Sequence, residues 1–195
     1  MRKYLPWIII GGVVLILFFW AKGINNTAVT LNQNIEEAWG NVQTAYQRRN
    51  DLIGNLVNTV KGAAEIEKST LTAVIEARAS ATQVKVDPTN ITPDQLAQFQ
   101  QAQAGVSSAL SRLLVTVERY PELKSQQRFA DLQAELTSTE NQILTARNRF
   151  NEAVKPYNTH IKRFPNNIFA GLFGFTEKSY FNAVEGADKP VEVQF

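Results

Sequence analysis

Hydrophobic side chains are distributed in two different ways along the chain. No charged side chain occurs between residues 5 and 21 (LPWIIIGGVVLILFFWA), whereas the sequence after Gly23 is polar, with apolar residues recurring every three or four positions. About 17 apolar residues are the least that a helix needs to cross the hydrocarbon core of a bilayer. A spacing of three to four is typical of amphipathic helices that bury one stripe of their surface. The pattern therefore predicts a transmembrane helix followed by a helical body.

The apolar segment is best interpreted as an uncleaved signal anchor. Pro6 stands where a helix begins, a position at which its missing N–H breaks no hydrogen bond. Trp7 and Trp20 stand at the two ends, where amphipathic rings prefer the headgroup region. A cleavable signal peptide is the alternative, but Phe19-Trp20-Ala21 places a bulky ring where small residues precede a cleavage site.

Few charges flank this segment, and they determine the expected orientation. Arg2 and Lys3 precede it, and only Lys22 follows it closely. Cytoplasmic flanks of membrane helices carry an excess of lysine and arginine. We therefore expect a cytoplasmic N-terminus and an exported body.

Three apolar seams follow in the body, over residues 39–63, 96–120 and 129–164. No stretch shows sustained strand alternation between turn signals, so we predict an all-α body. The loop Asp87-Pro88-Thr89-Asn90 separates the first two seams, and Pro121 and Pro165 end the second and third helices.

The number of long helices stays open between three and four. A straight helix over residues 26–84 would be covered over less than half its length by a returning helix at 94–119. A break near Gly62 would instead give four arms that run up and down, as in antiparallel bundles. The sequence around Gly62 contains no proline, so a continuous helix is the alternative. We divide the chain into a basic segment (1–4), a transmembrane signal anchor (5–22), a helical bundle (23–165) and an apolar, then polar tail (166–195).

The composition excludes most catalytic chemistry. The 195 residues include 20 lysines and arginines against 18 acidic residues, no cysteine and one histidine, His160. This near-balance argues against nucleic acid as a partner, because phosphate binding needs a strong basic excess. One imidazole and no thiol exclude two-histidine metal sites, disulfides and thiolate nucleophiles. We expect no enzyme activity, catalytic residue, cofactor or metal, and we expect His160 to face solvent.

A few charged residues fall on the apolar seams. Arg49 lies on the first seam, and Glu140 and Arg147 lie on the third. We interpret these residues, with Asp51 and Asn55, as a structural polar layer that fixes the register between helices. A recognition or catalytic pocket is the alternative. In a four-arm bundle Glu140 would stand level with Arg49, so that arrangement predicts an ion pair that a three-helix arrangement would not allow.

The tail begins with an apolar segment, residues 167–175 (NIFAGLFGF), that is too short to span a bilayer. If the last long helix returns toward the membrane, this segment would lie in the membrane interface or against the first helix, through Phe169, Leu172, Phe173 and Phe175. The alternative is that it caps the core of the bundle itself.

Several blocks of the sequence resemble the LemA family. They are residues 39–62 (with RRNDLIGNLVNTVKG), 118–124 (ERYPELK) and 132–141 (LQAELTSTEN), followed by Ala146-Arg147, Phe150-Asn151 and Tyr157-Asn158. Gly54 departs from the family, which more often has proline there. The resemblance implies a bacterial membrane protein with one N-terminal membrane helix and an antiparallel helical bundle. It brings no established enzyme activity and no catalytic residues.

We therefore expect a membrane-anchored, non-catalytic helical scaffold or adaptor of the bacterial cell envelope that acts through protein–protein contacts. It would be a single-pass protein of the inner membrane with a periplasmic body. The alternative is a partner or regulatory subunit of a membrane protease or other envelope complex, and a hydrolase is the least favoured interpretation. The expected partners are the lipid bilayer, other envelope proteins and a second copy of the chain, joined through coiled-coil-like seams.

Overall fold

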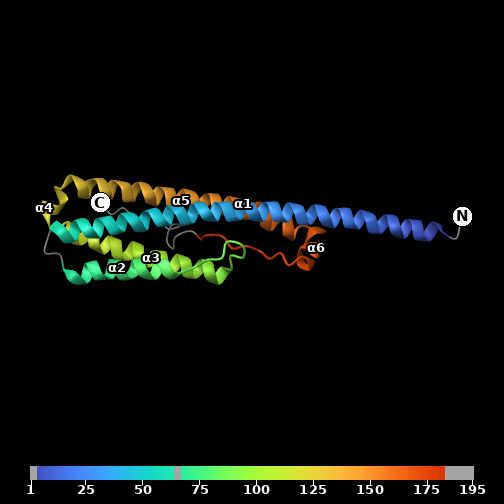
Figure 1. The fold of residues 1–195 in the computed structure, drawn as a ribbon, viewed down its shortest axis with the longest axis horizontal. Coiled ribbons are helices and arrows are strands. Elements are labelled where there is room, and N and C mark those ends of the chain that lie inside the picture. Colours follow the sequence, from blue (N-terminus) through green and yellow to red (C-terminus); the bar gives the residue numbers. More distant parts are fainter. Residues whose placement is uncertain (1–3, 64–66, 183–195) are drawn as a thin grey trace, which may run out of the picture.

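The computed structural model describes residues 4–63 and 67–182, and every regular element in these ranges is a helix (Figure 1). The predicted all-α class is confirmed. The elements are α1 (Leu5–Ala63), α2 (Lys68–Gln83), α3 (Pro93–Val117), α4 (Pro121–Lys124), α5 (Gln127–Lys162) and α6 (Asn166–Leu172).

The first helix, α1, joins the apolar segment to the body without a break. It has 59 residues, which at 1.5 Å per residue gives a length of about 88 Å. Residues 7–20 are exposed on every side and project alone from the bundle, whereas one face is buried from Ile24 onward (Figure 1). Among the described residues α1 is the one helix long and apolar enough to cross a membrane, which suggests a membrane anchor.

The body has four long arms, α1, α2, α3 and α5, that run alternately up and down (Figure 1). Because α1 ends at Ala63 and α2 begins at Lys68, the alternative of one helix continuing to residue 84 is wrong. The arms associate mainly in two pairs, α1 with α5 and α2 with α3.

The third arm, α3, begins with a capping box in which Thr92 and Gln95 bond each other's backbone N–H groups, and Pro93 occupies the first helical position.

The hydrophobic core is divided into two clusters along the bundle axis. The cluster nearer the anchor is aromatic: the Trp39 ring lies 5.2–6.0 Å from the rings of Phe99, Phe150 and Phe181. The distal cluster is aliphatic for the most part and includes Leu56, Leu113 and Leu123. No one element supplies either cluster, so each holds several arms together.

The C-terminal segment returns along the bundle as a strap, residues 174–182 (Figure 1). Gly174 has a positive φ of 77°, which lets the chain reverse after α6 at a position where other residues would be strained. The Asn158 side chain bonds both backbone groups of Lys178, at 2.8 and 2.9 Å. The Asn151 side chain bonds both backbone groups of Phe181 in the same way, at 3.0 and 2.8 Å.

The spacing of these two asparagines explains the register of the strap. Seven helical residues separate Asn151 from Asn158, a rise of about 10.5 Å. Three residues separate Lys178 from Phe181, and an extended chain covers about 10 Å over that number. The two asparagine side chains of α5 are therefore spaced to bond residues three apart in an extended segment. These bonds place Phe181 among the aromatic rings of the core.

Truncating the anchoring ring of the strap should destabilise the bundle. We expect Phe181→Ala to lower the free energy of unfolding by about 3–5 kcal/mol, because it leaves a void between three aromatic side chains. The matched control is Tyr180→Ala, one residue earlier, whose side chain is 40% exposed. Urea unfolding of the full chain in detergent, followed by circular dichroism, measures both. Equal effects of the two changes would show that the strap is not held by Phe181.

Candidate functional site

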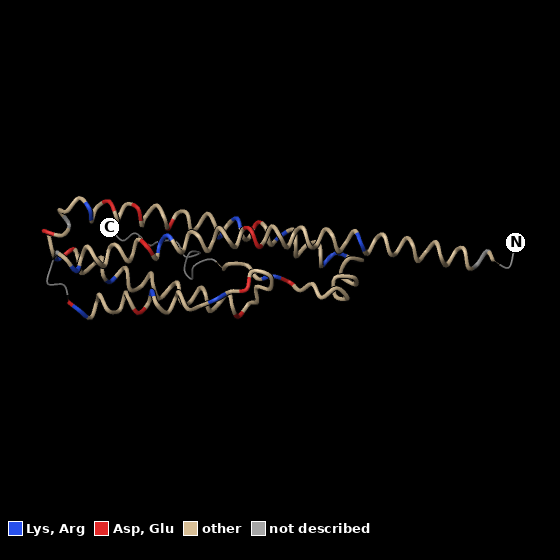
Figure 2. Tube along the Cα trace, viewed as in Figure 1, with Lys and Arg blue, Asp and Glu red and all other residues tan. Residues whose placement is uncertain are grey.

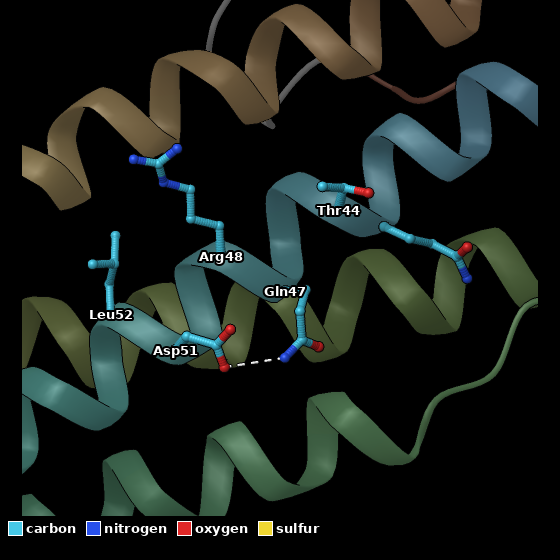
Figure 3. A pocket seen from close by; sticks show the side chains of 6 residues that line it. Thr44, Gln47, Arg48, Asp51 and Leu52 are labelled. Carbon is cyan, nitrogen blue, oxygen red and sulfur yellow. Dashed lines mark hydrogen bonds between the residues drawn. The ribbon is translucent and has the colours of Figure 1, made fainter.

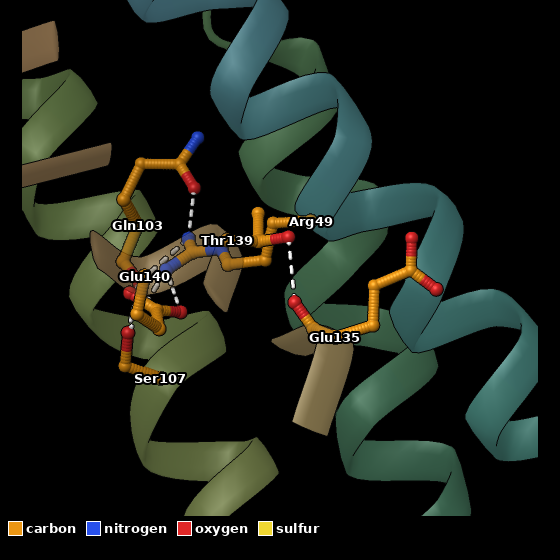
Figure 4. A network of polar contacts seen from close by, with 6 residues as sticks. All are labelled: Arg49, Gln103, Ser107, Glu135, Thr139 and Glu140. Atoms are coloured by element: carbon orange, nitrogen blue, oxygen red, sulfur yellow. Dashed lines mark hydrogen bonds and ion pairs between the residues drawn. The ribbon is translucent and has the colours of Figure 1, made fainter. Parts of the chain in front are cut away.

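A buried arginine occupies the centre of the bundle. Arg49 is 2% exposed on α1 and reaches between α3 and α5 (Figure 4). Its Nη2 donates to the side-chain and backbone oxygens of Gln103. Its Nη1 lies 3.2 Å from the Ser107 hydroxyl and 3.3 Å from a carboxylate oxygen of Glu140. We call Arg49, Gln103, Ser107 and Glu140 the Arg49 layer.

The Arg49 layer separates the two hydrophobic clusters. On α1 the aromatic cluster ends at Tyr46 and the aliphatic cluster begins at Leu52. On α3 and α5 the same division falls around Gln103 and Thr139, both buried polar residues. The boundary between the two clusters therefore lies at the same height on α1, α3 and α5. Arg49 lies at this boundary, where polar groups of the other two helices can bond it.

Tyr46 lies directly beside this layer. The Arg49 guanidinium is 4.9 Å from the centre of the Tyr46 ring, within range of a cation–π interaction. Burial raises the pKa of the Tyr46 phenol, and the positive charges of Arg147 and Arg49 oppose that rise. The phenol therefore stays protonated at neutral pH and does not supply a base.

The predicted pairing of Arg49 with Glu140 is present, but the other members of the predicted polar layer lie elsewhere. Glu140 itself is 46% exposed and approaches the guanidinium from the bundle surface. Asp51 and Asn55 are exposed on α1, outside the Arg49 layer. Arg147 is half-buried and bonds the strap, with Nη2 2.7 Å from the Asn182 carbonyl oxygen and its guanidinium 4.9 Å from the Phe181 ring.

The sequence analysis missed Gln103, Ser107 and the two strap asparagines. Gln103 carried a signal, because it is a polar residue on an otherwise apolar seam. Asn151 and Asn158 carried none that a helical period could reveal, since they bond an irregular segment about 20 to 30 residues further along the chain.

His160 is half-buried and does not point freely into solvent as expected. Its Nε2 lies 3.0 Å from the Ile24 carbonyl oxygen of α1, and its Nδ1 lies 3.3 Å from the Asn166 side-chain amide at the start of α6. This pattern fits a ring that donates from Nε2 and accepts at Nδ1. The imidazole thus joins three helices and has no neighbouring nucleophile among these contacts.

Lys178 is a buried charged residue of the strap. It is 4% exposed, and its Nζ donates to the Thr89 carbonyl oxygen at 2.9 Å. Burial lowers the pKa of this amine, and the carboxylates of Glu36 and Asp87 oppose the change. The lysine ties the strap to the loop between α2 and α3.

The hollows on the surface are open to solvent. One lies between α1 and α5 and is lined by Asn41, Thr44, Ala45, Arg48, Ser138, Asn141, Gln142, Thr145, Ala146 and Arg149; we call it the α1–α5 groove. A second is lined by α1 residues alone, and there Gln47 donates to Asp51 at 3.0 Å (Figure 3). In the part of the chain that the structure describes, no three histidine, cysteine or acidic side chains form a group that could hold a metal ion.

The sequence model of the LemA family matches residues 38–195. The chain is similar to magnetosome protein MamQ 2 of Paramagnetospirillum magneticum, 28% identical over 183 residues that cover 85% of this chain and 67% of the relative. Magnetosome protein MamQ of Magnetospirillum gryphiswaldense is 26% identical with the same coverage. Protein LemA of Metamycoplasma hominis is 23% identical over 170 residues, covering 87% of this chain and 74% of the relative. The chain belongs to the LemA family.

Removing Arg49 should be far more damaging than removing its acidic partner. We expect Arg49→Ala to lower the free energy of unfolding by about 3–5 kcal/mol, because it leaves a cavity and strands Gln103. Glu140→Ala should cost about 1 kcal/mol, since the carboxylate is partly solvated and Gln103 still holds the guanidinium. The loss of unfolding free energy in the double variant should be smaller than the sum of the losses in the two single variants.

Urea unfolding of the four proteins, with circular dichroism as the signal, gives this cycle. The control is Arg48→Ala on the same helix, whose 2.8 Å ion pair with Glu135 is about half exposed and should be worth less than about 1 kcal/mol. Equal losses for Arg48→Ala and Arg49→Ala would contradict a stabilising role for the layer.

Proposed function

We propose that this LemA-family protein is a membrane-anchored, non-catalytic helical scaffold or adaptor of the bacterial cell envelope that acts through protein–protein contacts. The observation that carries the proposal is α1, in which the apolar segment and the first arm of the bundle form one helix. From Lys22 to Ala63 this helix rises about 60 Å. A rod of this kind presents binding surface at a fixed distance from the bilayer.

The arrangement of the polar groups supports a binding role. Three buried or half-buried ionisable side chains are each hydrogen-bonded to the backbone or side chains of other elements. They are Arg49, His160 and Lys178. A catalytic group needs a reacting atom within hydrogen-bond reach in a site that can exclude water, and these contacts instead join helices. The names of the similar proteins, magnetosome protein and LemA, state no reaction.

The α1–α5 groove is the surface that we propose for partner contact. It extends along the two longest helices and offers amides, hydroxyls and the guanidinium group of Arg149, whereas the guanidinium of Arg48 pairs with Glu135. Arginine contributes strongly to protein interfaces because its planar fork bonds carboxylates and carbonyl groups in fixed geometry. A polar or acidic segment of another envelope protein fits this chemistry.

Charge reversal in the groove should release the partner. We expect Arg149→Glu to reduce by at least tenfold (~1.4 kcal/mol) the amount of partner recovered with the full chain after crosslinking in membranes and purification in detergent. The control is Arg112→Glu, an exposed arginine on α3, outside the groove, which should leave recovery unchanged. Mass spectrometry identifies what is recovered.

The identity of the recovered protein separates the interpretations. Recovery of the chain itself, lost in Arg149→Glu, would support a homo-oligomeric scaffold. A membrane protease in stoichiometric amount would favour the alternative, a regulatory subunit of such a complex. Turnover of a substrate panel, abolished by one substitution without loss of folding, would contradict a non-catalytic role.

We further propose that the body lies on the periplasmic side of the inner membrane, with the N-terminus in the cytoplasm. The support is the excess of basic residues before the apolar segment. Ser125→Cys tests it, because the chain has no native cysteine and Ser125 is exposed at the end of the bundle far from the anchor. A membrane-impermeant thiol reagent should label this variant in intact spheroplasts. Labelling only after lysis would place the body in the cytoplasm.

A further inference from the structure

Helix α6 lies at the end of the bundle nearest the apolar part of α1 (Figure 1). An exposed apolar surface is found on and beside this helix. Its side chains are Phe164, 82% exposed, Ile168, 54%, Leu172, 77%, and Phe173, 46%. Ile168 and Leu172 are four residues apart in the helix and therefore share a face. Soluble surfaces rarely gather this many large apolar side chains without a contact that covers them. We call these four residues the α6 apolar face.

The α6 apolar face is held rigidly by the other side of the same segment. Ala170 is 3% exposed and belongs to the aromatic cluster, against which Phe175 also packs. At the start of α6 the Asn166 side chain bonds His160, and α6 contacts both α1 and α5. Packing of one face against the bundle therefore fixes the direction in which Leu172 and its neighbours point.

The height of α6 along α1 places this face at the membrane surface. His160, six residues before Asn166, contacts the carbonyl oxygen of Ile24, three residues beyond the end of the uncharged segment at Ala21. Three residues are a rise of about 4.5 Å. The polar interface outside the hydrocarbon core is about 5–7 Å deep on each side of a bilayer. If residues 5–21 cross the core, the end of α5 and the start of α6 lie at the level of the headgroups.

The charges around the face agree with that position. Between Arg163 and Thr176 the sequence contains no acidic residue. Lys22 and Arg163 are exposed near the same end, where basic side chains attract anionic lipid phosphates. Lys162 is also exposed, but it is paired with Glu177. Figure 2 shows basic positions in blue where the bundle meets the projecting part of α1. Apolar side chains beside a basic rim are the pattern of segments that lie in a membrane interface.

We propose that the α6 apolar face inserts into the interfacial region of the bilayer that α1 crosses, as a second membrane contact of the protein. The inference rests on α1 being the membrane anchor, as in the proposed function. Phe169 and Phe175, which the sequence grouped with this face, are partly buried on the protein side. With two attachments, the long rod of α1 could no longer tilt freely about its transmembrane segment, and the bundle would stand at a fixed angle to the membrane.

Depth measurements on single-cysteine variants test this proposal. The full chain has no cysteine to remove, and Leu172→Cys changes an exposed side chain, so a nitroxide label there leaves the packing intact. The matched control is Leu144→Cys, an equally apolar and 56% exposed position on α5, away from α6. Leu15→Cys in the apolar segment reports whether α1 itself is embedded.

The labelled proteins are placed in phosphatidylethanolamine–phosphatidylglycerol vesicles, and power-saturation spectra measure collision with oxygen and with a water-soluble nickel chelate. We expect nickel collision at Leu172→Cys to be several-fold lower than at Leu144→Cys, with oxygen collision raised, as for a label in lipid. Nickel collision equal to that of the control, with Leu15→Cys protected, would overturn this proposal and leave the anchor intact. Protection of Leu172→Cys from both reagents would indicate a covering protein surface and would also overturn it. Free nickel collision at Leu15→Cys would overturn the anchor and this proposal together.

Discussion

One buried guanidinium determines how the arms of the bundle align. Arg49 is taken out of water almost completely, so its charge must be met by groups from other helices or the fold would be strongly destabilised. Gln103 and Ser107 on α3 and Glu140 on α5 meet it at one height. Sliding α5 along α1 by one helical turn, about 5.4 Å, would separate the guanidinium from Glu140.

The sequence blocks that resemble the LemA family can now be assigned to physical tasks in this chain. The first block contains Arg49, the α1 side of the distal cluster and part of the α1 side of the aromatic cluster. The pairs Phe150-Asn151 and Tyr157-Asn158 each place an aromatic ring in the core and an amide against the strap. Arg147 adds a third contact to the same strap. These blocks therefore fix the register between helices and hold the strap against α5.

Much of the fold follows from local patterns that the sequence displays directly. The seams predicted the long helices, and the matching of arm lengths predicted that Arg49 and Glu140 would meet. The continuity of α1 was not predicted, because a change from apolar to polar composition at Gly23 alters what surrounds a helix without interrupting its hydrogen bonds. Asp51 and Asn55 follow Arg49 by two and six residues, offsets that turn their side chains away from its face of the helix and toward solvent. The strap was missed because an asparagine that binds an irregular backbone leaves no periodic signal.

The elements that resist sliding also connect the two ends of the molecule. His160 fixes α5 to α1 next to the apolar segment, and the Arg49 layer fixes the same two helices again 25 residues higher along α1, a rise of about 38 Å. Two such attachments on one pair of helices oppose both sliding and separation of the helices. The strap adds further contacts, because Lys178 is bonded both to Asn158 of α5 and to the loop before α3. A movement of the apolar end of α1 would then be passed to the bundle through both attachments. Transmission of position along α1 is the mechanical behaviour that the proposed scaffold role needs.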